Sequence, residues 1–489
     1  MTVTIALVRR NAYVDSVSLL QVTADVAALD GVLEAALVMA TDLNREVLSD
    51  SALLVDDAVS AGPNDLVIAV RAIDETAAAA ALQASEALLA RRRGGGPGNG
   101  QSAEQAPPRS LRSAHRGVPE ANLAVISVPG PFAAGEARLA LADGLNVFLF
   151  SDNVSVEDEV SLKQTARDQG LLVMGPDCGT AILNGIGLGF SNAVRRGRIG
   201  LIGASGTGLQ EVTSLLHQAG EGVSQAIGTG GRDLSTEVGG ITTLQALALL
   251  RDDPQTETIV LISKPPAAEV ADSVLRAAAE TGKPVVACLL GSTMAAPDGV
   301  RVARNLYQAA RLAAPAAAAW TSVSADDLPR VRLRDGQRQV RGLFCGGTLC
   351  DEAEAALAEG SDHRFIDFGD DQYTRGRAHP MIDPTLRNHA IVDAGADPRV
   401  AVLLLDVILG RGSHADPAGA AAPAIREAIA TASADGRQIT VLAHVVGTDR
   451  DPQGLAHQEA TLREVGVHVL SSNYHAAVAA SLLLEAVTA

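Results

Sequence analysis

The feature that most constrains the fold is a segment that occurs twice, as IGLIGASGTGLQEV at 199–212 and as VRGLFCGGTLCDEA at 340–353. Each copy has an apolar run typical of a strand, then small residues containing Gly-Thr, then a stretch with helical periodicity. Three further landmarks repeat in the same order: QAIGTGGRD matches IDFGDDQYT, DDPQTETIVLI matches ADPRVAVLLLD, and PVVACLLGS matches TVLAHVVGT. The repeat predicts two homologous flavodoxin-like modules, at 198–312 and 340–489.

The segment 117–197 has a different strand pattern. Three apolar runs, LAVISV, NVFLF and LLVMG, alternate with two helical stretches, which predicts a parallel sheet with crossover connections and hence a Rossmann-like domain. Ligands of such sheets bind at the carboxyl ends of the strands. We therefore expect PGPF, SDN and GPDCG to line a binding site, with Pro129, Asp177 and Cys178 among its residues.

The remaining segments complete an α/β chain. Residues 1–90 alternate strand and helix patterns and predict a small N-terminal α/β domain. Residues 91–116 are rich in Gly, Pro and Arg, which predicts a flexible linker, with a cationic arm that binds anions as the alternative. A second, Ala- and Pro-rich linker is predicted at 313–339.

Composition excludes several classes of protein. No apolar run is long enough to span a membrane, and the first residues lack the pattern of a secretory signal. The four cysteines show no paired metal spacing, so we expect a reduced, cytoplasmic protein. A net charge of −18 argues against nucleic acid as a partner. A small anionic substrate is compatible with this charge, because it responds to the local field.

The repeated turn has a specific chemical use. A helix that starts directly after a strand points its first N–H groups out of the sheet edge, where they and the helix dipole attract an anion. The glycines Gly206, Gly346 and Gly347 let a ligand approach the backbone, and the hydroxyls of Ser205, Thr207 and Thr348 add donors. Small residues also serve helix packing alone. Two copies favour function, because modules related by a pseudo-twofold axis can direct both helix starts at one phosphate.

These motifs resemble a known family. Residues 117–312, with VISVPGPF, GPDCG, GRIGLIGASGTG and GTGGRD in order, resemble the alpha subunit of succinyl-CoA synthetase, which implies a CoA-binding-type Rossmann domain. Residues 340–489 resemble the carboxy-terminal ligase module of its beta subunit. The order of parts, with the N-terminal domain and HVVGTDRDPQG, is similar to the FdrA proteins. The resemblance implies that the two helix starts flank a phosphate, that Gly230 belongs to the site, and that the Cys178 loop meets the thiol end of CoA. A buried structural thiol is the alternative for Cys178.

Three departures from the synthetase shape the functional hypothesis. Residues 293–310 contain no histidine where the synthetase carries its phosphohistidine, and Lys264 follows the strand IVLIS where the synthetase has a carboxylate. The nucleotide-binding ATP-grasp domain is absent, and residues 1–90 lack the glycine pattern of the CoA fold. What the sequence retains is an anion site, for which Lys264 and Arg232 are the candidate cations.

The FdrA resemblance then implies an acyl-phosphate reaction, carbamoyl transfer between carbamoyl phosphate and oxamate in allantoin breakdown, with partner subunits or a homodimer. One alternative is an acyl-CoA synthetase that uses the ATP-grasp domain of another chain, with CoA as cofactor. The other is a non-catalytic scaffold subunit. A phosphate or acyl phosphate is the expected ligand, and no resident cofactor is predicted.

Several polar residues near the end of the chain keep two interpretations. His444 lies at the end of a predicted strand, where it could act as general base or carbonyl polariser, or be a buried, hydrogen-bonded histidine. Asp449 and Gln453 could hold an amide group, or form the turn at Asp-Pro. His457 is either an exposed helical histidine or a relocated phosphoryl carrier.

The loop FGDDQYTRGRAHPMID at 368–383 gathers acidic and basic side chains: Asp370, Asp371, Arg375, Arg377 and His379. It could bind a carboxylate or Mg²⁺, or be a salt-bridged surface loop, which we prefer because no third ligand can be assigned. The histidines show no zinc spacing. No metal site is predicted.

Overall fold

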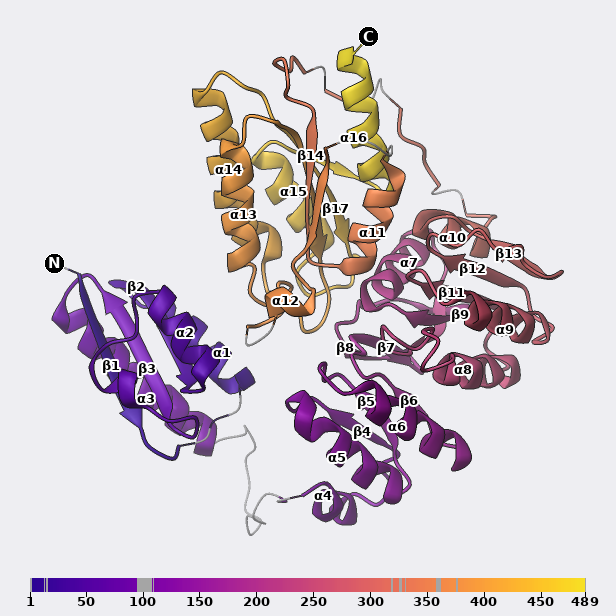
Figure 1. The fold of residues 1–489 in the computed structure, drawn as a ribbon, viewed down its shortest axis with the longest axis horizontal. Helices are drawn as coiled ribbons and strands as arrows, with labels where there is room; N and C mark the ends of the chain where they lie inside the picture. Colours follow the sequence, from indigo (N-terminus) through magenta and orange to yellow (C-terminus); the bar gives the residue numbers. More distant parts are fainter. Residues whose placement is uncertain are drawn as a thin grey trace. The chain divides into compact units, whose positions relative to one another are not determined.

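The computed structural model describes residues 2–12, 14, 16–94, 108, 110–317, 320–324, 328–329, 331–357, 362–374 and 377–488. The chain divides into two compact units, Met1–Ala106 and Pro107–Ala489 (Figure 1). Among the described helices, none combines the length and the apolar character needed to cross a membrane.

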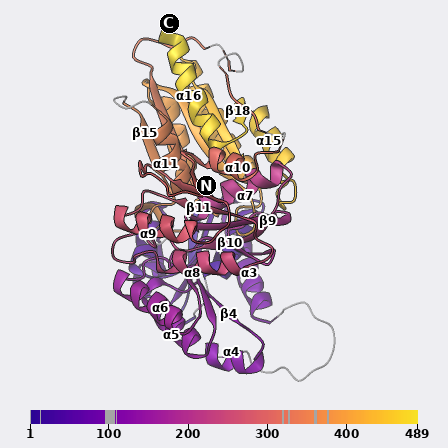
Figure 2. The same ribbon diagram turned by 90° about the vertical axis from the view of Figure 1, so that its right-hand side faces the viewer.

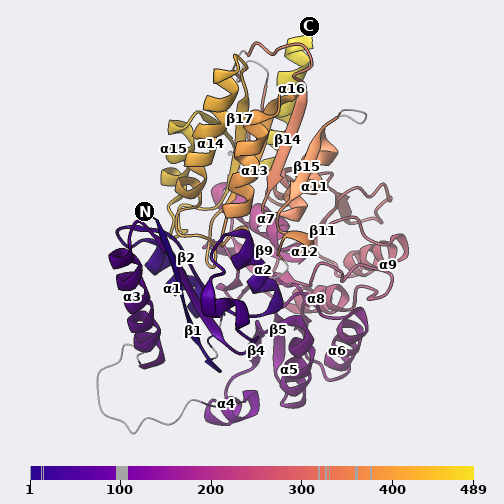
Figure 3. The ribbon, with the colours of Figure 1, turned by 60° about the vertical axis from the view of Figure 1, so that its left-hand side comes forward.

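The first unit is a three-stranded antiparallel sheet with helices on both faces. Its strand order is β1 (Val3–Arg9), β3 (Leu66–Ala72), β2 (Val32–Met39). Alternate residues of β3 face opposite sides. Ile68 and Val70 pack with α1 (Ser16–Ala27) and α3 (Glu75–Gly94), whereas Val67 and Ala69 pack with α2 (Asp42–Asp50) and the turn η1 (Asp56–Ser60). Figure 3 shows α2 and α3 on opposite sides of this sheet.

The ends of the segment predicted as a linker are helical. Helix α3 continues to Gly94, and α4 spans Leu111–Gly117, where the side chain of Ser110 accepts from Ser113 N and Ser113 returns the contact as a capping box. Most of the segment between these helices lies outside the described residues.

The second unit begins with a small parallel sheet, β4 (Leu123–Ile126), β5 (Asn146–Leu149) and β6 (Val173–Met174), with α5 (Gly130–Ala142) and α6 (Val156–Asp168). The next segment departs from the predicted boundary at 197. A hairpin, β7 (Thr180–Leu183) and β8 (Ile186–Gly189), joins the sheet of the following module through β10. Gly228 allows this, because a Cβ there would contact the carbonyl of Thr180 and lie 2.5 Å from Cys178 Sγ.

The first module is a seven-stranded sheet in the order β13-β12-β11-β9-β10-β7-β8, parallel except for the hairpin. Its other strands are β9 (Arg196–Ala204), β10 (Val223–Gly228), β11 (Thr258–Ser263), β12 (Val285–Leu289) and β13 (Val300–Val302). Its helices are α7 (Gly206–Gln218), α8 (Ile241–Asp252), α9 (Ala268–Ala279) and α10 (Leu306–Ala313).

The second module is a five-stranded parallel sheet in the order β15-β14-β16-β17-β18. Its strands are β14 (Gln339–Phe344), β15 (Arg364–Asp367), β16 (Val400–Ile408), β17 (Thr440–Val446) and β18 (Val467–Leu470). Its helices are α11 (Gly347–Ala356), α12 (Asp371–Thr374), α13 (Thr385–Ala396), α14 (Pro417–Ala434), α15 (Leu455–Glu464) and α16 (Asn473–Thr488).

A shared core joins the two modules. Helices α7 and α10 of the first module pack against α11 and α16 of the second, and one cluster of buried side chains contains residues of all four helices, including Leu209, Leu306, Leu349 and Ala476 (Figure 2). Burying this much apolar surface between the sheets fixes the modules relative to each other. The pairing of α7 with α11 and of α10 with α16 is the arrangement that a pseudo-twofold repeat predicts.

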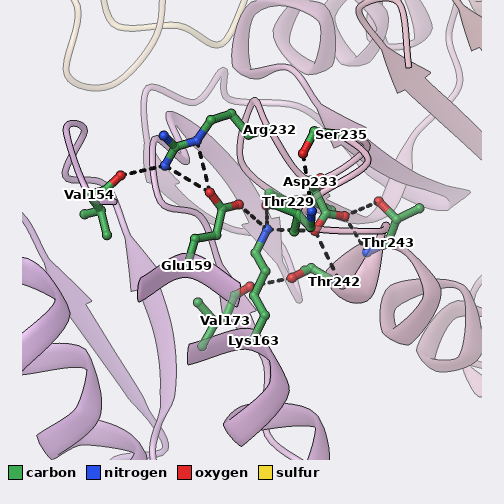
Figure 4. Close-up of polar contacts among 11 residues, drawn as sticks. Val154, Glu159, Lys163, Val173, Thr229, Arg232, Asp233, Ser235, Thr242 and Thr243 are labelled. Atoms are coloured by element: carbon green, nitrogen blue, oxygen red, sulfur yellow. Dashed lines mark hydrogen bonds and ion pairs between the residues drawn. The ribbon is translucent and has the colours of Figure 1, made fainter. Parts of the chain in front are cut away.

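A buried charge network joins the small sheet to the first module (Figure 4). Lys163 of α6 is fully buried, and its Nζ donates to Glu159 Oε1 at 2.8 Å, to Asp233 Oδ1 at 2.7 Å and to the Thr229 carbonyl at 2.9 Å. Arg232 reaches the same cluster by donating to Glu159 Oε2 and, at 2.8 Å, to the Val154 carbonyl. Each carboxylate therefore has a cation beside it.

We expect Lys163→Met to destabilise the protein strongly. Removing one partner leaves buried carboxylates without full compensation, which typically costs about 3–5 kcal/mol. The midpoint of urea unfolding of the full chain should fall accordingly, while Arg167→Ala, an exposed change on the same helix, should leave it in place. Equal midpoints for Lys163→Met and the parent protein would contradict this role of the network.

Candidate functional site

The two repeated helix starts meet. Ser205, the N-cap of α7, accepts a hydrogen bond from Gly208 N at 2.9 Å, and its Oγ lies 2.5 Å from Thr348 Oγ1 in the first turn of α11. A Cβ on Gly346 would lie 2.9 Å from atoms of the Thr207 side chain. The structure thus brings together the six residues predicted to flank a phosphate: Ser205, Gly206, Thr207, Gly346, Gly347 and Thr348. That they bind phosphate stays a prediction.

Reciprocal caps hold this meeting point in place. Glu211 of α7 accepts from Asn473 N at 3.2 Å at the start of α16, and Glu352 of α11 accepts from Leu306 N at 2.6 Å at the start of α10. Both glutamates are buried. They occupy matching places in the two repeats, four residues after Thr207 and Thr348, so aligning the repeats beyond the turn would have found them.

Lys264 reaches the start of α11 from the first module. It follows β11, and its Nζ lies 2.6 Å from the point that a Cβ on Gly347 would occupy. It also pairs with Asp351 Oδ2 at 3.4 Å and remains 43% exposed. The lysine predicted from the sequence as a site cation is therefore beside the predicted anion site, and Gly347 supplies the space for it.

Carboxylates surround this lysine. Asp367, at the end of β15, contacts the same point beside Gly347, and its Oδ1 accepts from Gly369 N at 2.8 Å. Burial raises the pKa of Asp367 to about 6, and Lys264 opposes the rise. Asp177 follows β6, and its side chain is exposed to solvent. Desolvation by the neighbouring protein atoms and the nearby carboxylates of Asp152 and Asp371 raise its pKa to about 7. The site therefore holds two carboxyl groups that titrate near neutral pH.

His379 completes the cluster. Its Nδ1 accepts a hydrogen bond from Met381 N at 3.2 Å, and its Nε2 lies 2.8 Å from the point that a Cβ on Gly369 would occupy. Burial lowers the pKa of His379 to about 4, so the ring is neutral at physiological pH. The sequence identifies His379 as part of the charged loop at 368–383, with a carboxylate or Mg²⁺ as the possible ligand, but it does not single out Asp367 or Asp351. No local motif marks these side chains, because the fold assembles them from separate strand ends.

Four other predicted residues are engaged elsewhere. Arg232 is held in the Lys163 network. The ring of His444 contacts Glu211 Oε2 at 2.8 Å and the Leu470 carbonyl at 3.0 Å, and it is buried. Gln453 exchanges hydrogen bonds with the backbone of Gly410, and Asp449 accepts from His217 Nε2 at 2.6 Å. These contacts support the structural interpretations of His444, Asp449 and Gln453, and they engage Arg232, the second cation predicted for the anion site, with Glu159 and the Val154 carbonyl.

The strand ends of the small sheet are closely packed. A Cβ on Gly230 would contact the Pro176 carbonyl, and the Cys178 thiol is buried against the Thr180 carbonyl at 3.6 Å. Burial raises the pKa of Cys178 to about 12, so this thiol stays protonated. Pro129 caps α5 and is exposed. The charged side chains that follow β5 and β6 here are Asp152 and Asp177.

The charged loop at 368–383 and His457 of α15 are the remaining predicted candidates. Asp370 Oδ1 accepts from Gln372 N at the start of α12, Arg377 is exposed, and Arg375 lies outside the described residues. Within the described part of the chain, no three His, Cys, Asp or Glu side chains are grouped to hold a metal ion. His457 lies exposed on α15.

Comparison with known families adds independent findings. A CoA-ligase family model matches residues 343–483, and a CoA binding domain model matches 194–291. The second match covers most of the module that carries α7 and Lys264, rather than the 117–197 segment to which the resemblance assigned a CoA-binding-type fold. A third model, described as AllF, heavy metal-associated domain, matches residues 1–107.

Whole proteins are also similar to this chain. The Escherichia coli (strain K12) protein YahF is 44% identical over 95% of this chain and 96% of its own length. A succinate–CoA ligase [ADP-forming] alpha subunit of Archaeoglobus fulgidus is 31% identical over 37% of this chain and 63% of that subunit. A solved dinucleotide-forming acetyl-coenzyme A synthetase of Ca. Korarchaeum cryptofilum is 16% identical, with a TM-score of 0.34, over 75% of this chain and 84% of that chain.

The heavy metal in the description of the third family model does not fit these residues. Soft metals are held by cysteine and histidine side chains. Residues 1–107 contain neither, because the four cysteines and ten histidines all come later in the chain. The first unit therefore matches this family model without these ligands.

We expect the pH dependence of stability to report on Glu352. Burial and the nearby Glu211 raise the pKa of Glu352 from 4.5 to about 7, so between these values the folded protein holds a proton that the unfolded chain has released. The free energy of unfolding should therefore fall as pH rises from about 4.5 to 7, by about 3 kcal/mol for this group. Glu352→Gln should flatten urea-unfolding midpoints over this range, and exposed Glu280→Gln should not. A parallel pH profile for Glu352→Gln would refute the assignment.

Proposed function

Because the chain belongs to the FdrA family, on the succinyl-CoA synthetase scaffold, we propose that it is an enzyme subunit that transfers a carbamoyl group between carbamoyl phosphate and oxamate. The single observation that supports an acyl-phosphate substrate is the contact of the two helix starts beside Lys264. Each start favours an anion by about 0.3–2 kcal/mol, and the ammonium group adds a full positive charge. We therefore place the phosphate beside Lys264, where the N-termini of α7 and α11 meet.

The described residues can be given separate roles in the transfer. The nitrogen of oxamate attacks the carbamoyl carbon, a C–N bond forms, and the C–O bond to the phosphate breaks with its electron pair leaving on phosphate. The amides of α7 and α11 and Lys264 would stabilise the charge on the departing phosphate. Asp367, with a pKa near 6, is the candidate to take the proton from the nitrogen. No covalent intermediate on the protein is needed.

A second function is favoured by the matches to CoA-ligase and CoA binding models. In that reaction the chain would act as an acyl-CoA synthetase with a nucleotide-binding domain on another chain. It requires a phosphorylated protein side chain and bound CoA. The buried Cys178 and the acidic strand ends at Asp152 and Asp177 oppose CoA, so we rank it second.

The test of the proposed function is binding of carbamoyl phosphate to the full chain, measured by isothermal titration without CoA. We expect Lys264→Ala to raise the dissociation constant at least tenfold, about 1.4 kcal/mol. Gly347→Ala should weaken binding similarly, because its Cβ would displace Lys264 and Asp367. Exposed Arg276→Ala removes the same charge from α9 and should change nothing.

Two outcomes would oppose the proposal. If the parent protein binds carbamoyl phosphate no better than Lys264→Ala, the helix starts are not the phosphate site. If radioactive ATP, in the presence of a nucleotide-binding partner, labels a histidine and CoA binds, the acyl-CoA synthetase reading replaces it.

A further inference from the structure

The unassigned group at this site is the imidazole of His379. It lies beside Asp367, which in turn lies beside Lys264 at the start of α11. The inference below rests on the proposed function, since it concerns the substrate held at that site.

The hydrogen bonds of His379 fix which nitrogen carries the proton. Nδ1 faces the backbone N–H of Met381 and accepts its hydrogen bond at 3.2 Å. A neutral imidazole has one N–H and one lone pair, so the proton must sit on Nε2. Nε2 therefore acts as a donor, and its lone pair is not available to attack phosphorus.

The position of the ring is also fixed. Ile382 N and Asp383 N donate to the His379 carbonyl at 2.8 and 3.0 Å, which holds the backbone in a turn. The ring packs against Phe190 of the first module, with centroids 5.4 Å apart. A ring held on both its backbone and its face is preorganised to direct one N–H in one direction.

A glycine lies directly beside Nε2. Gly369 has no positive φ, so its backbone does not require glycine. Its side-chain position is instead crowded, with the Cys345 carbonyl at 2.7 Å, His379 Nε2 at 2.8 Å and Asp367 Oδ1 at 3.0 Å. Asp367 Oδ1 already accepts from Gly369 N. Among the described residues, Nε2 meets no hydrogen-bond acceptor, so it is available to a substrate oxygen.

We propose that the Nε2–H of His379 donates a hydrogen bond to the carbonyl oxygen of the bound acyl phosphate, which makes it a catalytic residue of the transfer. Negative charge grows on this oxygen as the nitrogen attacks, and a fixed donor stabilises it more in the transition state than in the ground state. In this arrangement Lys264 and the helix starts bind the phosphate, while His379 donates a hydrogen bond to the carbonyl oxygen.

The test uses the infrared spectrum of ¹³C-labelled carbamoyl phosphate bound to the full chain. A hydrogen bond to the carbonyl lowers its stretching frequency. We expect a lowered frequency with the parent protein, its loss in His379→Phe, and partial retention in His379→Gln, which keeps an N–H donor. The dissociation constant should change less than threefold in both variants, and exposed His457→Phe should behave as the parent protein.

Turnover gives the second measurement. With partner subunits present, His379→Phe should lower kcat by about 10²-fold with little change in KM, since removing one such donor costs about 10²–10³-fold. If Lys264-dependent binding is intact but the frequency and kcat of His379→Phe equal those of the parent, the role of His379 is overturned while the proposed function stands. If the parent protein does not bind carbamoyl phosphate, both are overturned.

Discussion

The structure of the second unit depends on the meeting of two helix N-termini, where Ser205 of α7 contacts Thr348 of α11. Two positive dipole ends placed together repel each other, so the arrangement needs negative charge nearby. The carboxylate of Asp406, which pairs with the buried Arg387, accepts from Cys345 N and Gly346 N at 2.8 and 2.9 Å, directly before α11. Asp351 and Asp367 lie beside the same helix start. The proposed anionic ligand would therefore enter a site whose electrostatics are already partly balanced, and Lys264 would supply the positive charge that favours its binding.

The two modules repeat a scaffold but not its chemistry. Glu211 and Glu352 occupy equivalent places, yet Glu211 bonds to His444 of β17, whereas the group near Glu352 in β12 is the Cys288 thiol, which stays protonated because burial raises its pKa. Burial acts to lower the pKa of His444, but the Glu211 carboxylate outweighs it and raises the pKa. Glu211 and His444 form a compensated ion pair, whereas Glu352 has no such partner among the residues that the structure describes and its pKa is raised to about 7. The two modules thus share an architecture, but the residues that face Glu211 and Glu352 differ, so the two glutamates have different charge environments.

Sequence reasoning succeeded where the signal is local. The two helix starts, the strand that places Lys264 and the loop that carries Asp177 all follow from periodicity and from residues adjacent in the chain. It could not identify partners that are distant in the chain. Arg232 pairs with Glu159, and His444 with Glu211, through contacts between elements far apart in sequence, so the sequence alone left both interpretations of His444 open. The hairpin β7–β8 changed sheets because Gly228 lets it approach β10, a packing fact that no pattern within the hairpin reveals.

The site contains both a cation and several carboxylates, which favours a substrate that uses both kinds of group. A phosphate alone would be served best by several cations, but here Lys264 stands among Asp351, Asp367 and Asp177. Carboxylates with raised pKa values are costly near a phosphate unless they take part in proton transfer, and a base with a pKa near 6 or 7 is well matched to removing a proton at physiological pH. An acyl phosphate attacked by a neutral nitrogen needs this combination, because phosphate charge is held on one side and a proton is released on the other. A nucleotide-dependent cycle through a phosphohistidine would need a nucleophilic imidazole, and the ring of His379 presents its N–H, not its lone pair, to the site.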